Sequence, residues 1–232
     1  MSTDWKYKFG LIVPSWNTTM EYECCRMAPQ GVSIHTSRIA HTDDSEESLL
    51  HTAEMGPVAG ELLAHASVNA ICFGCTGASF LREGIDQEII GKIEAATKTP
   101  TTTTSTAIDE ALKAMNIQSV AIATPYPQWI NERLAQFLVN SGFKVVSQKG
   151  LNVDCPAFLP PENAYKIAME SNCSEAEGIL ISCTNFRSLE FIEQIEKDSG
   201  KPVISSNSAT MWKLLQMAGV QEKPANAGRL FK

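Results

Sequence analysis

The stretch NAICFGCTGASF at residues 69–80 has a counterpart about a hundred residues later, AEGILISCTNFRS at residues 176–188. Each is an apolar run that ends in Cys-Thr. A short apolar run bounded by small and polar residues is typical of a buried strand. The repetition predicts two similar units, each presenting a cysteine at the end of a strand.

Outward from these stretches, short apolar runs alternate with longer amphipathic segments along the whole chain. Strict alternation of strands and helices is typical of a parallel sheet with helices on both faces, so we predict an α/β protein. Strands are predicted at residues 8–13, 31–40, 69–74, 100–105, 119–124, 143–150, 178–182 and 201–207. Helices are predicted at residues 17–28, 45–66 with a kink at Gly56-Pro57, 84–98, 106–116, 127–141, 161–171, 188–200 and 208–219.

The second half of the chain repeats the pattern of the first half. The first strands of the two halves end at Pro14 and Pro125, and Cys75 and Cys183 follow equivalent later strands. Repetition over several consecutive elements indicates duplication of one structural unit. We predict two similar lobes related by a pseudo-twofold axis.

The lobe boundary is placed just before the pattern restarts. The predicted lobes are residues 1–116 and residues 117–232, and the last helix of the first lobe can pack on the other lobe. The two are expected to act as one functional unit.

The composition excludes several classes of protein. Of the 232 residues, 44% are hydrophobic, and the formal net charge is −7 without a basic cluster, which argues against nucleic-acid binding. Because the longest apolar runs are strand-sized and the first residues lack a signal-peptide core, we expect no membrane association and a cytoplasmic location. The sequence has no GxGxxG after its first strand and no P-loop, so no cofactor is expected.

The two Cys-Thr sites carry the predicted chemistry. Ligands of open parallel sheets bind at the carboxyl ends of the strands, so Cys75 and Cys183 should face one small carboxylate from opposite sides of a cleft between the lobes. A cysteine at the start of a helix meets unpaired amide groups and the positive end of the helix dipole, which lower its pKa. The same amides can hold a carboxylate or enediolate oxygen. Candidate substrate-binding residues beside the cysteines are Thr76, Gly77, Thr184 and Asn185.

The cysteines and histidines also allow alternative interpretations, as packing, redox, metal-binding or surface residues. A lone strand-end cysteine is more often a packing residue, but the repetition favours a function for this pair. Cys72 and Cys75 form a CxxC, yet Cys72 falls inside a strand and further ligands are missing nearby, so redox and metal roles are disfavoured. Structural roles are expected for Cys24, Cys25, Cys155 and Cys173, and surface or helix-face roles for His35, His41, His51 and His65.

The ends of the two first strands supply two further candidates. Asn17 lies where the first helix begins, where it can cap the helix or bind a ligand. Tyr126 lies between two prolines at the matching point of the second lobe, and its hydroxyl can donate to a substrate oxygen.

At these residues the sequence resembles the aspartate/glutamate racemase superfamily, and within it the branch of maleate cis–trans isomerases and arylmalonate decarboxylases. The resemblance runs from GLIVPSWNTTME (10–21) to GRLF (228–231). TPTTTTSTAIDEALKAMNIQSVAIATPY (99–126) and GKPVISSNSATMW (200–212) are especially similar to the decarboxylases. The resemblance implies two flavodoxin-like lobes, a central site without cofactor or metal, and a homo-oligomer, either a dimer or a tetramer.

The two branches differ at the cysteines. Arylmalonate decarboxylases carry only the second-lobe cysteine and have Gly at the position of Cys75, whereas racemases and maleate isomerases carry both. The motif PSWNTTME also resembles the isomerases' PSSNTTME. The resemblance implies that Cys75 is the nucleophile, that Cys183 is its partner, and that Asn17, Tyr126 and Asn163 bind substrate carboxylates.

Three functions are compatible with this sequence. The first is cofactor-independent isomerisation of maleate to fumarate by a two-cysteine mechanism. The second is proton transfer beside a carboxylate, either racemisation of an amino acid such as aspartate or glutamate, or decarboxylation of an arylmalonate. The third is a carboxylate-binding protein without turnover. Each takes a small mono- or dicarboxylate.

Overall fold

The apolar runs form two separate, wholly parallel sheets in the computed structural model, which describes residues 6–232. The first five residues of the predicted first lobe lie outside this part. The first sheet has the order β2 (Val32–Ile39), β1 (Tyr7–Pro14), β3 (Ala70–Phe73), β4 (Thr101–Thr103). The second has the order β6 (Lys144–Gly150), β5 (Ser119–Thr124), β7 (Gly178–Ile181), β8 (Val203–Ser205). The predicted α/β class is confirmed.

Helices cover both faces of the sheets, which is why the central strands are buried along most of their length. The first-half helices are α1 (Met20–Met27), α2 (Glu46–Glu54), α3 (Gly56–His65), α4 (Thr76–Ser79), α5 (Ile85–Thr97) and α6 (Thr104–Ala114). The second-half helices are α7 (Gln128–Asn140), α8 (Glu162–Ser171), α9 (Ile192–Ser199) and α10 (Ser206–Met217). Short 3₁₀ turns lie at Pro156–Phe158, Leu189–Phe191 and Arg229–Phe231.

The structure matches the predicted elements closely and departs from them at helix ends. The predicted kink divides residues 45–66 into α2 and α3 at Met55, because Pro57 lacks the amide that would continue the first helix. Helix α6 begins earlier than predicted because the Thr103 hydroxyl caps it by accepting from the Thr106 amide. The single-turn helix α4 was not predicted as a separate element.

The duplication extends to individual hydrogen bonds. In the first half, Glu94 Oε1 accepts from the amide of Thr101 at 2.9 Å, where β4 begins. In the second half, Glu196 Oε1 accepts from the amide of Val203 at 3.1 Å, where β8 begins. Both pairs have the same sequence separation and stand 102 positions apart (196−94 and 203−101). A carboxylate that fixes the start of the last strand is therefore part of the repeated unit.

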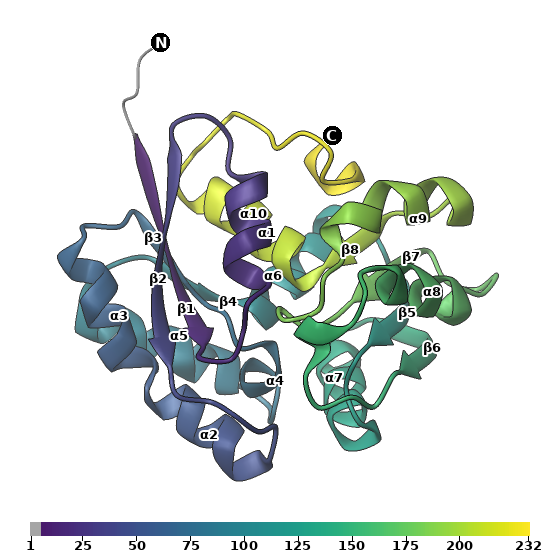
Figure 1. Ribbon diagram of the computed structural model, residues 1–232, viewed down its shortest axis with the longest axis horizontal. Coiled ribbons are helices and arrows are strands. Elements are labelled where there is room, and N and C mark those ends of the chain that lie inside the picture. Colours follow the sequence, from purple (N-terminus) through teal and green to yellow (C-terminus); the bar gives the residue numbers. More distant parts are fainter. Residues whose placement is uncertain (1–5) are drawn as a thin grey trace.

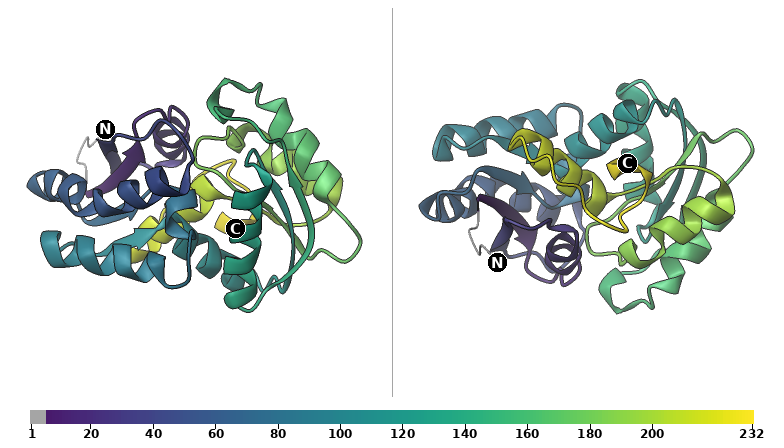
Figure 2. Two further views of the ribbon diagram at one scale, coloured as in Figure 1. Left: turned by 90° about the horizontal axis from the view of Figure 1, so that it is seen from below. Right: turned by 90° about the horizontal axis from the view of Figure 1, so that it is seen from above.

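The last helices of the two halves pack against each other at the centre of the molecule. Helix α10 contacts α6, α1 and β3 of the first half, and α6 contacts β8 of the second half. Figures 1 and 2 show α10 lying against the purple-to-blue half, although it follows the green half in the chain. Glu110 of α6 and Lys213 of α10 form an ion pair at 2.5 Å across this contact. The boundary near residue 116 therefore stays a prediction.

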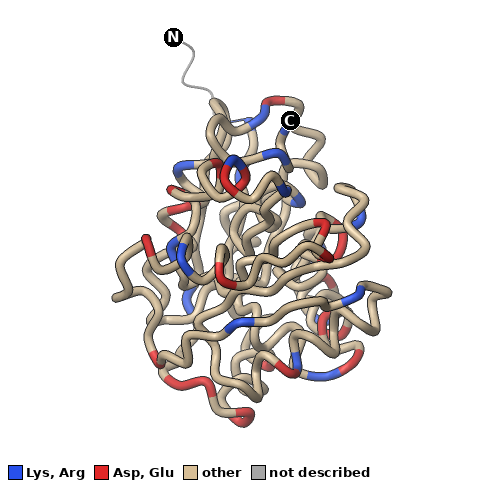
Figure 3. The backbone as a smooth tube through the Cα atoms, turned by 90° about the vertical axis from the view of Figure 1, so that its right-hand side faces the viewer, with Lys and Arg blue, Asp and Glu red and all other residues tan. Residues whose placement is uncertain are grey.

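Charged residues are scattered along the described chain. Figure 3 shows Lys and Arg positions interspersed with Asp and Glu, without a basic face in the side that it displays. Among the described helices, none has the length and apolar character needed to cross a bilayer.

Candidate active site

The carboxyl ends of β1, β3, β5 and β7 surround one small cavity of about 30 Å³ between the two sheets. Both Cys75 and Cys183 line it. Other candidates from the sequence that line it are Asn17, Thr76, Gly77, Tyr126, Thr184 and Asn185. The expected convergence of two strand ends from the two halves is therefore present in the structure.

Cys75 lies at the junction of β3 and α4. It is the N-cap of α4 and only 6% exposed. Just before it, Gly74 lets β3 pass close to its neighbours, because a Cβ there would lie 2.4 Å from Met20 Sδ and 2.8 Å from the Ile12 carbonyl oxygen. This tight packing holds the Cys75 backbone at the cavity.

Cys183 has a strained backbone. Its φ is +140°, a conformation that residues with a Cβ rarely adopt, and such strain costs about 1–3 kcal/mol. The strain is held in place because the Cys183 amide donates to Ser206 Oγ at 3.0 Å. The Asn185 amide donates to Cys183 Sγ at 3.4 Å. Backbone strain of this kind is concentrated at functional sites.

The expected low thiol pKa is wrong for this closed cavity. Burial raises the pKa of Cys75 to about 12, against the opposing hydrogen bond from the Ala78 amide. Burial likewise raises the pKa of Cys183 to about 12, while the Asn185 amide and the Tyr126 hydroxyl act to lower it. The physical reason is that α4 is one turn long and a turn, not a long helix, follows Cys183, so little dipole offsets the loss of water. Both sulfurs are neutral thiols near pH 7.

Asn17 and Thr184 join the two halves at the cavity. Asn17 Oδ1 accepts from the amides of Thr19 and Met20, so Asn17 caps α1 as the sequence allowed. Its Nδ2 donates to Thr184 Oγ1 at 3.0 Å, and the Thr184 hydroxyl donates to the Gly74 carbonyl at 2.8 Å. Asn17 thus combines the capping role and a place in the cavity wall.

Asn185 offers an unused donor to the cavity. It is 4% exposed, and its Oδ1 accepts from the Thr18 amide at 3.1 Å. Its Nδ2 has no hydrogen-bond partner among the described residues. A buried amide donor without a partner is costly unless a ligand or water meets it.

Tyr126 presents its hydroxyl to the same cavity. The side chain is 6% exposed, and its ring packs edge-on against Phe80. Burial raises the pKa of Tyr126 well above its ordinary value, so the phenol stays protonated and can donate.

One sequence candidate lies away from the cavity, and another has a packing role besides its place in the wall. Asn163 is not among the residues that line the cavity. Its Nδ2 instead donates to the Pro160 carbonyl at 3.0 Å within its own turn, because the loop before α8 carries it to the outside. Gly77 does line the cavity, but a Cβ there would lie 3.3 Å from Leu49 Cδ2, so the small residue also lets α2 approach α4.

The sequence analysis missed five residues of the wall: Pro14, Trp16, His41, Asp44 and Pro156. The expected surface or helix-face role is wrong for His41, which is only 3% exposed. Its segment follows β2, which pairs in parallel with β1, so the same sheet edge carries both ends. The available signal was the acidic, helix-capping sequence HTDDSEES (41–48) directly after a predicted strand.

The remaining cysteines do not enter the cavity wall. Cys72 is fully buried in β3, with its sulfur 3.8 Å from the hydroxyls of Thr104 and Thr210. Cys25 is exposed, whereas its neighbour Cys24 is buried. Within residues 6–232, no group of three or more His, Cys, Asp or Glu side chains is arranged to hold a metal ion.

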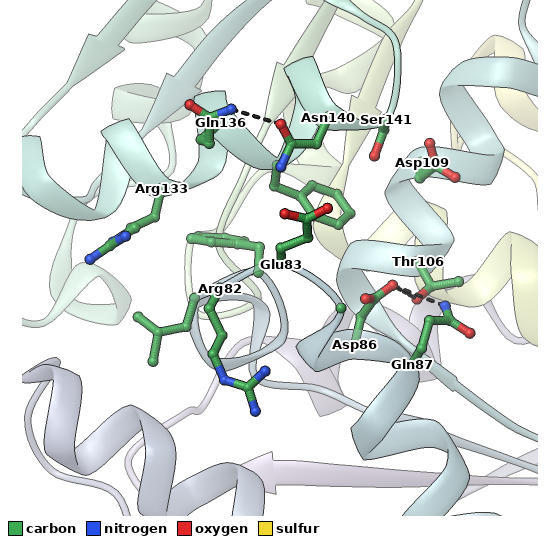
Figure 4. A pocket seen from close by; sticks show the side chains of 14 residues that line it. Arg82, Glu83, Asp86, Gln87, Thr106, Asp109, Arg133, Gln136, Asn140 and Ser141 are labelled. Carbon is green, nitrogen blue, oxygen red and sulfur yellow. Dashed lines mark hydrogen bonds between the residues drawn. The ribbon is translucent and has the colours of Figure 1, made fainter.

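A second, larger cavity of about 510 Å³ lies on the outside of the molecule. Figure 4 shows it between side chains from the segment before α5 and its first turn, from α6 and from α7, including Arg82, Glu83 and Arg133. Its lining has charges of both signs and neither Cys75 nor Cys183. The smaller cavity, where the two thiols meet, is the better candidate for chemistry.

The sequence model of the arylmalonate decarboxylase family matches residues 9–231. The chain belongs to this family. Within the Asp/Glu racemase-like group, it falls in the branch that contains arylmalonate decarboxylases and maleate isomerases. Both Cys75 and Cys183 lie within the matched part.

Individual proteins of this branch are similar to the present chain over different lengths. A maleate isomerase of Pseudomonas putida is 27% identical over 243 residues, covering 97% of each chain. An arylmalonate decarboxylase of Bordetella bronchiseptica is 34% identical over 142 residues, covering 59% of each chain. A Pseudomonas putida maleate isomerase crystallised with maleate has the same fold, with a TM-score of 0.93, 24% identity and coverage of 97% of each chain.

Proposed function

We propose that this chain is a cofactor-independent isomerase that acts on the cis double bond of a maleate-type acid, converting maleate to fumarate. The observation that carries the proposal is the pair of thiols from equivalent strand ends at one cavity with amide and hydroxyl donors. A neutral thiol and a phenol can supply protons without a metal or cofactor. The presence of Cys75, where the decarboxylases have Gly, favours the isomerase over the decarboxylase.

In the reaction, a thiol S–H adds across the double bond of the substrate and is then eliminated again. Cys75 sulfur forms a bond to one alkene carbon, and a proton passes to the other carbon, with Cys183 as the proton donor. The proton lost by Cys75 restores Cys183. The former double bond is now single and rotates; reversal of both transfers then breaks the C–S bond and releases the trans acid. Atoms and electrons balance without an oxidant or reductant.

Related proteins support this route. The liganded relatives include a Nocardia farcinica maleate cis–trans isomerase mutant with a covalently bound succinylcysteine intermediate, which matches this fold with a TM-score of 0.92. A succinylcysteine is what S–H addition to maleate yields. Because a cavity of about 30 Å³ holds about one water, binding a four-carbon acid also requires its wall to move outward.

The test is turnover of maleate followed by proton NMR. We expect fumarate from the wild type and a loss of about 10³-fold or more in kcat/KM for Cys75→Ala and Cys183→Ala. Cys25→Ala is the matched control, because this exposed cysteine lies outside the cavity wall. Absence of fumarate at high enzyme concentration, or an active Cys75→Ala variant, would remove the proposal.

A second candidate is decarboxylation or racemisation beside a carboxylate. The 34% identity to the Bordetella arylmalonate decarboxylase favours decarboxylation. Loss of CO₂ from an arylmalonate that needs only Cys183 would support decarboxylation, and deuterium exchange into aspartate or glutamate would support racemisation. Thermal stabilisation by a carboxylate without any product would indicate a binding protein. A homo-oligomer and a cytoplasmic location stay predictions.

A further inference from the structure

The first turn of α10 contacts the strained backbone of Cys183. Ser206, the first residue of α10, is fully buried, and its Oγ accepts from the Cys183 amide at 3.0 Å. A φ of +140° persists at a residue with a Cβ only where the surrounding structure over-determines it. Ser206 is not among the residues that line the cavity, so any effect that it has on the chemistry passes through Cys183.

A capping box holds this first turn in place. Ser205 Oγ accepts from the Ser208 amide at 3.0 Å, and Ser208 Oγ accepts from the Ser205 amide at 2.9 Å. In the same turn, Asn207 Nδ2 donates to the Thr184 carbonyl at 3.1 Å. The turn is therefore fixed by its own hydrogen bonds and contacts both residues of the second Cys-Thr pair.

The Ser206 hydroxyl also contacts the segment of the other thiol. The Thr76 hydroxyl donates to Ser206 Oγ at 3.4 Å, and Thr76 directly follows Cys75. A serine oxygen has two lone pairs, so it can accept from Thr76 and from the Cys183 amide at once. One oxygen atom thus links the strand end that bears Cys75 to the strand end that bears Cys183.

The matching residue of the first half has different contacts. Thr104 stands 102 positions before Ser206 (206−104), the same offset as between the two carboxylates that fix the starts of β4 and β8. Thr104 is also fully buried and begins α6, but its hydroxyl lies 3.4 Å from the Phe73 carbonyl and 3.2 Å from Thr210 Oγ1. Cys75 has an ordinary extended backbone, with a φ of −104°. The hydroxyl at this repeated position therefore holds a thiol residue in the half where that residue is strained.

We propose that Ser206 is a positioning residue that fixes Cys183 opposite Cys75, so that the Cys183 thiol can deliver its proton to the substrate carbon. This inference rests on the proposed isomerisation, in which Cys183 is the proton donor. Without the Ser206 oxygen, the backbone at Cys183 relaxes toward an ordinary φ and moves the sulfur from its place in the wall. Because a misplacement of about 1 Å can cost about 100-fold in rate, the loss falls on proton transfer.

The first measurement compares kcat and KM for maleate in the wild type, Ser206→Ala and Ser206→Thr. We expect Ser206→Ala to lower kcat by about 10- to 100-fold and to leave KM within about threefold of the wild type. Ser206→Thr keeps the oxygen, and the first half has Thr at the matching position, so its kcat should stay within about threefold of the wild type.

Thr104→Val is the matched control for loss of a buried hydroxyl. It removes an equally buried hydroxyl from the start of α6, and Thr104 is outside the cavity wall. We expect this variant to keep the wild-type kcat. A general packing role of the two hydroxyls would instead affect both variants alike.

Hydrogen exchange of the Cys183 amide, followed by NMR, tests the contact without any substrate. Loss of the acceptor should speed this exchange by about tenfold or more in Ser206→Ala and leave it unchanged in Ser206→Thr and Thr104→Val. Ser206→Cys places a weakly accepting sulfur at the same position, and it replaces Ser206→Ala in both measurements if that variant does not fold.

The two measurements separate failure of this inference from failure of the proposed reaction. Faster exchange in Ser206→Ala alone, with no fumarate from the wild type, rejects the isomerisation and retains Ser206 as the residue that positions Cys183. Unchanged exchange in Ser206→Ala overturns the inference. In an active enzyme, an unchanged kcat, a rise in KM in place of the fall in kcat, or an equal loss of kcat in Thr104→Val also overturns it.

Discussion

At the scale of single residues, the two thiols differ from free cysteine through loss of water. Burial raises the pKa of Cys75 and of Cys183 to about 12. Because only the thiolate reacts readily with alkylating agents, the reactive fraction is small at pH 7 and rises with pH. The chemistry therefore depends on proton transfer at the moment of addition rather than on a resting thiolate.

This predicts a particular pH profile for alkylation by iodoacetamide. We expect the rate at both cysteines to rise by about tenfold for each pH unit from pH 7 to pH 9, without a plateau. Peptide-resolved mass spectrometry at each pH measures the two sites separately, and glutathione provides a reference thiol of ordinary pKa. A plateau below pH 8 at either site would show a resting thiolate and contradict the prediction.

The backbone strain at Cys183 makes a second prediction. Replacing Cys183 by Gly removes the Cβ that disfavours a φ of +140°, whereas Ala retains it. The relief of about 1–3 kcal/mol is partly offset by about 0.5–1 kcal/mol from the greater freedom of Gly in the unfolded chain. We expect Cys183→Gly to have a free energy of unfolding about 1 kcal/mol larger than Cys183→Ala in urea titrations. Equal or lower stability of the Gly variant would argue against strain.

At the scale of secondary-structure elements, α1 fixes the loop that follows Cys183. Glu23 is 2% exposed, and its Oε1 accepts from the amides of Ser188 and Leu189 at 2.7 and 2.9 Å. Its Oε2 accepts from Asn207 Nδ2 at 2.7 Å, and Asn207 also donates to the Thr184 carbonyl. A first-half helix thus orders the second-half loop that follows Cys183.

Glu23 predicts a pH-dependent stability. Burial raises its pKa above the ordinary value of 4.5, although the three hydrogen bonds oppose the rise. The folded protein therefore keeps this proton to a higher pH than the unfolded chain, so the contribution of Glu23 to stability falls as pH rises from 4.5 to the raised pKa. We expect the free energy of unfolding of the wild type, minus that of Glu23→Gln, to decrease over this window. The decrease should be about 1.4 kcal/mol for each unit by which the pKa of Glu23 in the folded protein exceeds its ordinary value.

Urea titrations from pH 4 to pH 7 measure this difference. The control is Glu132→Gln, which removes an exposed carboxylate on α7 that only accepts from Gln128. Its difference from the wild type should change little over the same window. A difference that is flat or rising for Glu23→Gln would mean that the carboxylate is stabilised by its hydrogen bonds more than it is penalised by burial.

At the scale of the whole molecule, the two halves share their interior. The contact of α10 with α6, the Asn17–Thr184 hydrogen bond and the Glu23 contacts all cross between them. We therefore expect one cooperative unfolding transition rather than two. Tryptophan fluorescence, with Trp16 in the first half and Trp129 in the second, should give the same urea midpoint as far-ultraviolet circular dichroism. Separate midpoints would show that the lobes unfold independently.

The sequence by itself determined the order of the elements, the parallel sheets and the repeated Cys-Thr ends. These features are local, because consecutive residues determine the periodicity of strands and helices and the positions where strands end. It also identified Cys75, Cys183, Asn17, Tyr126 and the residues after each cysteine as candidates, and the structure brings these to one cavity. Asn163 was assigned to the site because its short loop resembles that of the family. In the structure its side chain instead donates to the Pro160 carbonyl.

Only the tertiary structure decided the wall and the electrostatics of the site. The approach of His41 and Asp44 depends on the pairing of β2 beside β1, and the raised thiol pKa depends on how completely two separate halves exclude water. Likewise, the place of α10 on the opposite half follows from contacts between residues far apart in the chain. Burial and long-range packing are properties of the assembled fold, so no local pattern encodes them.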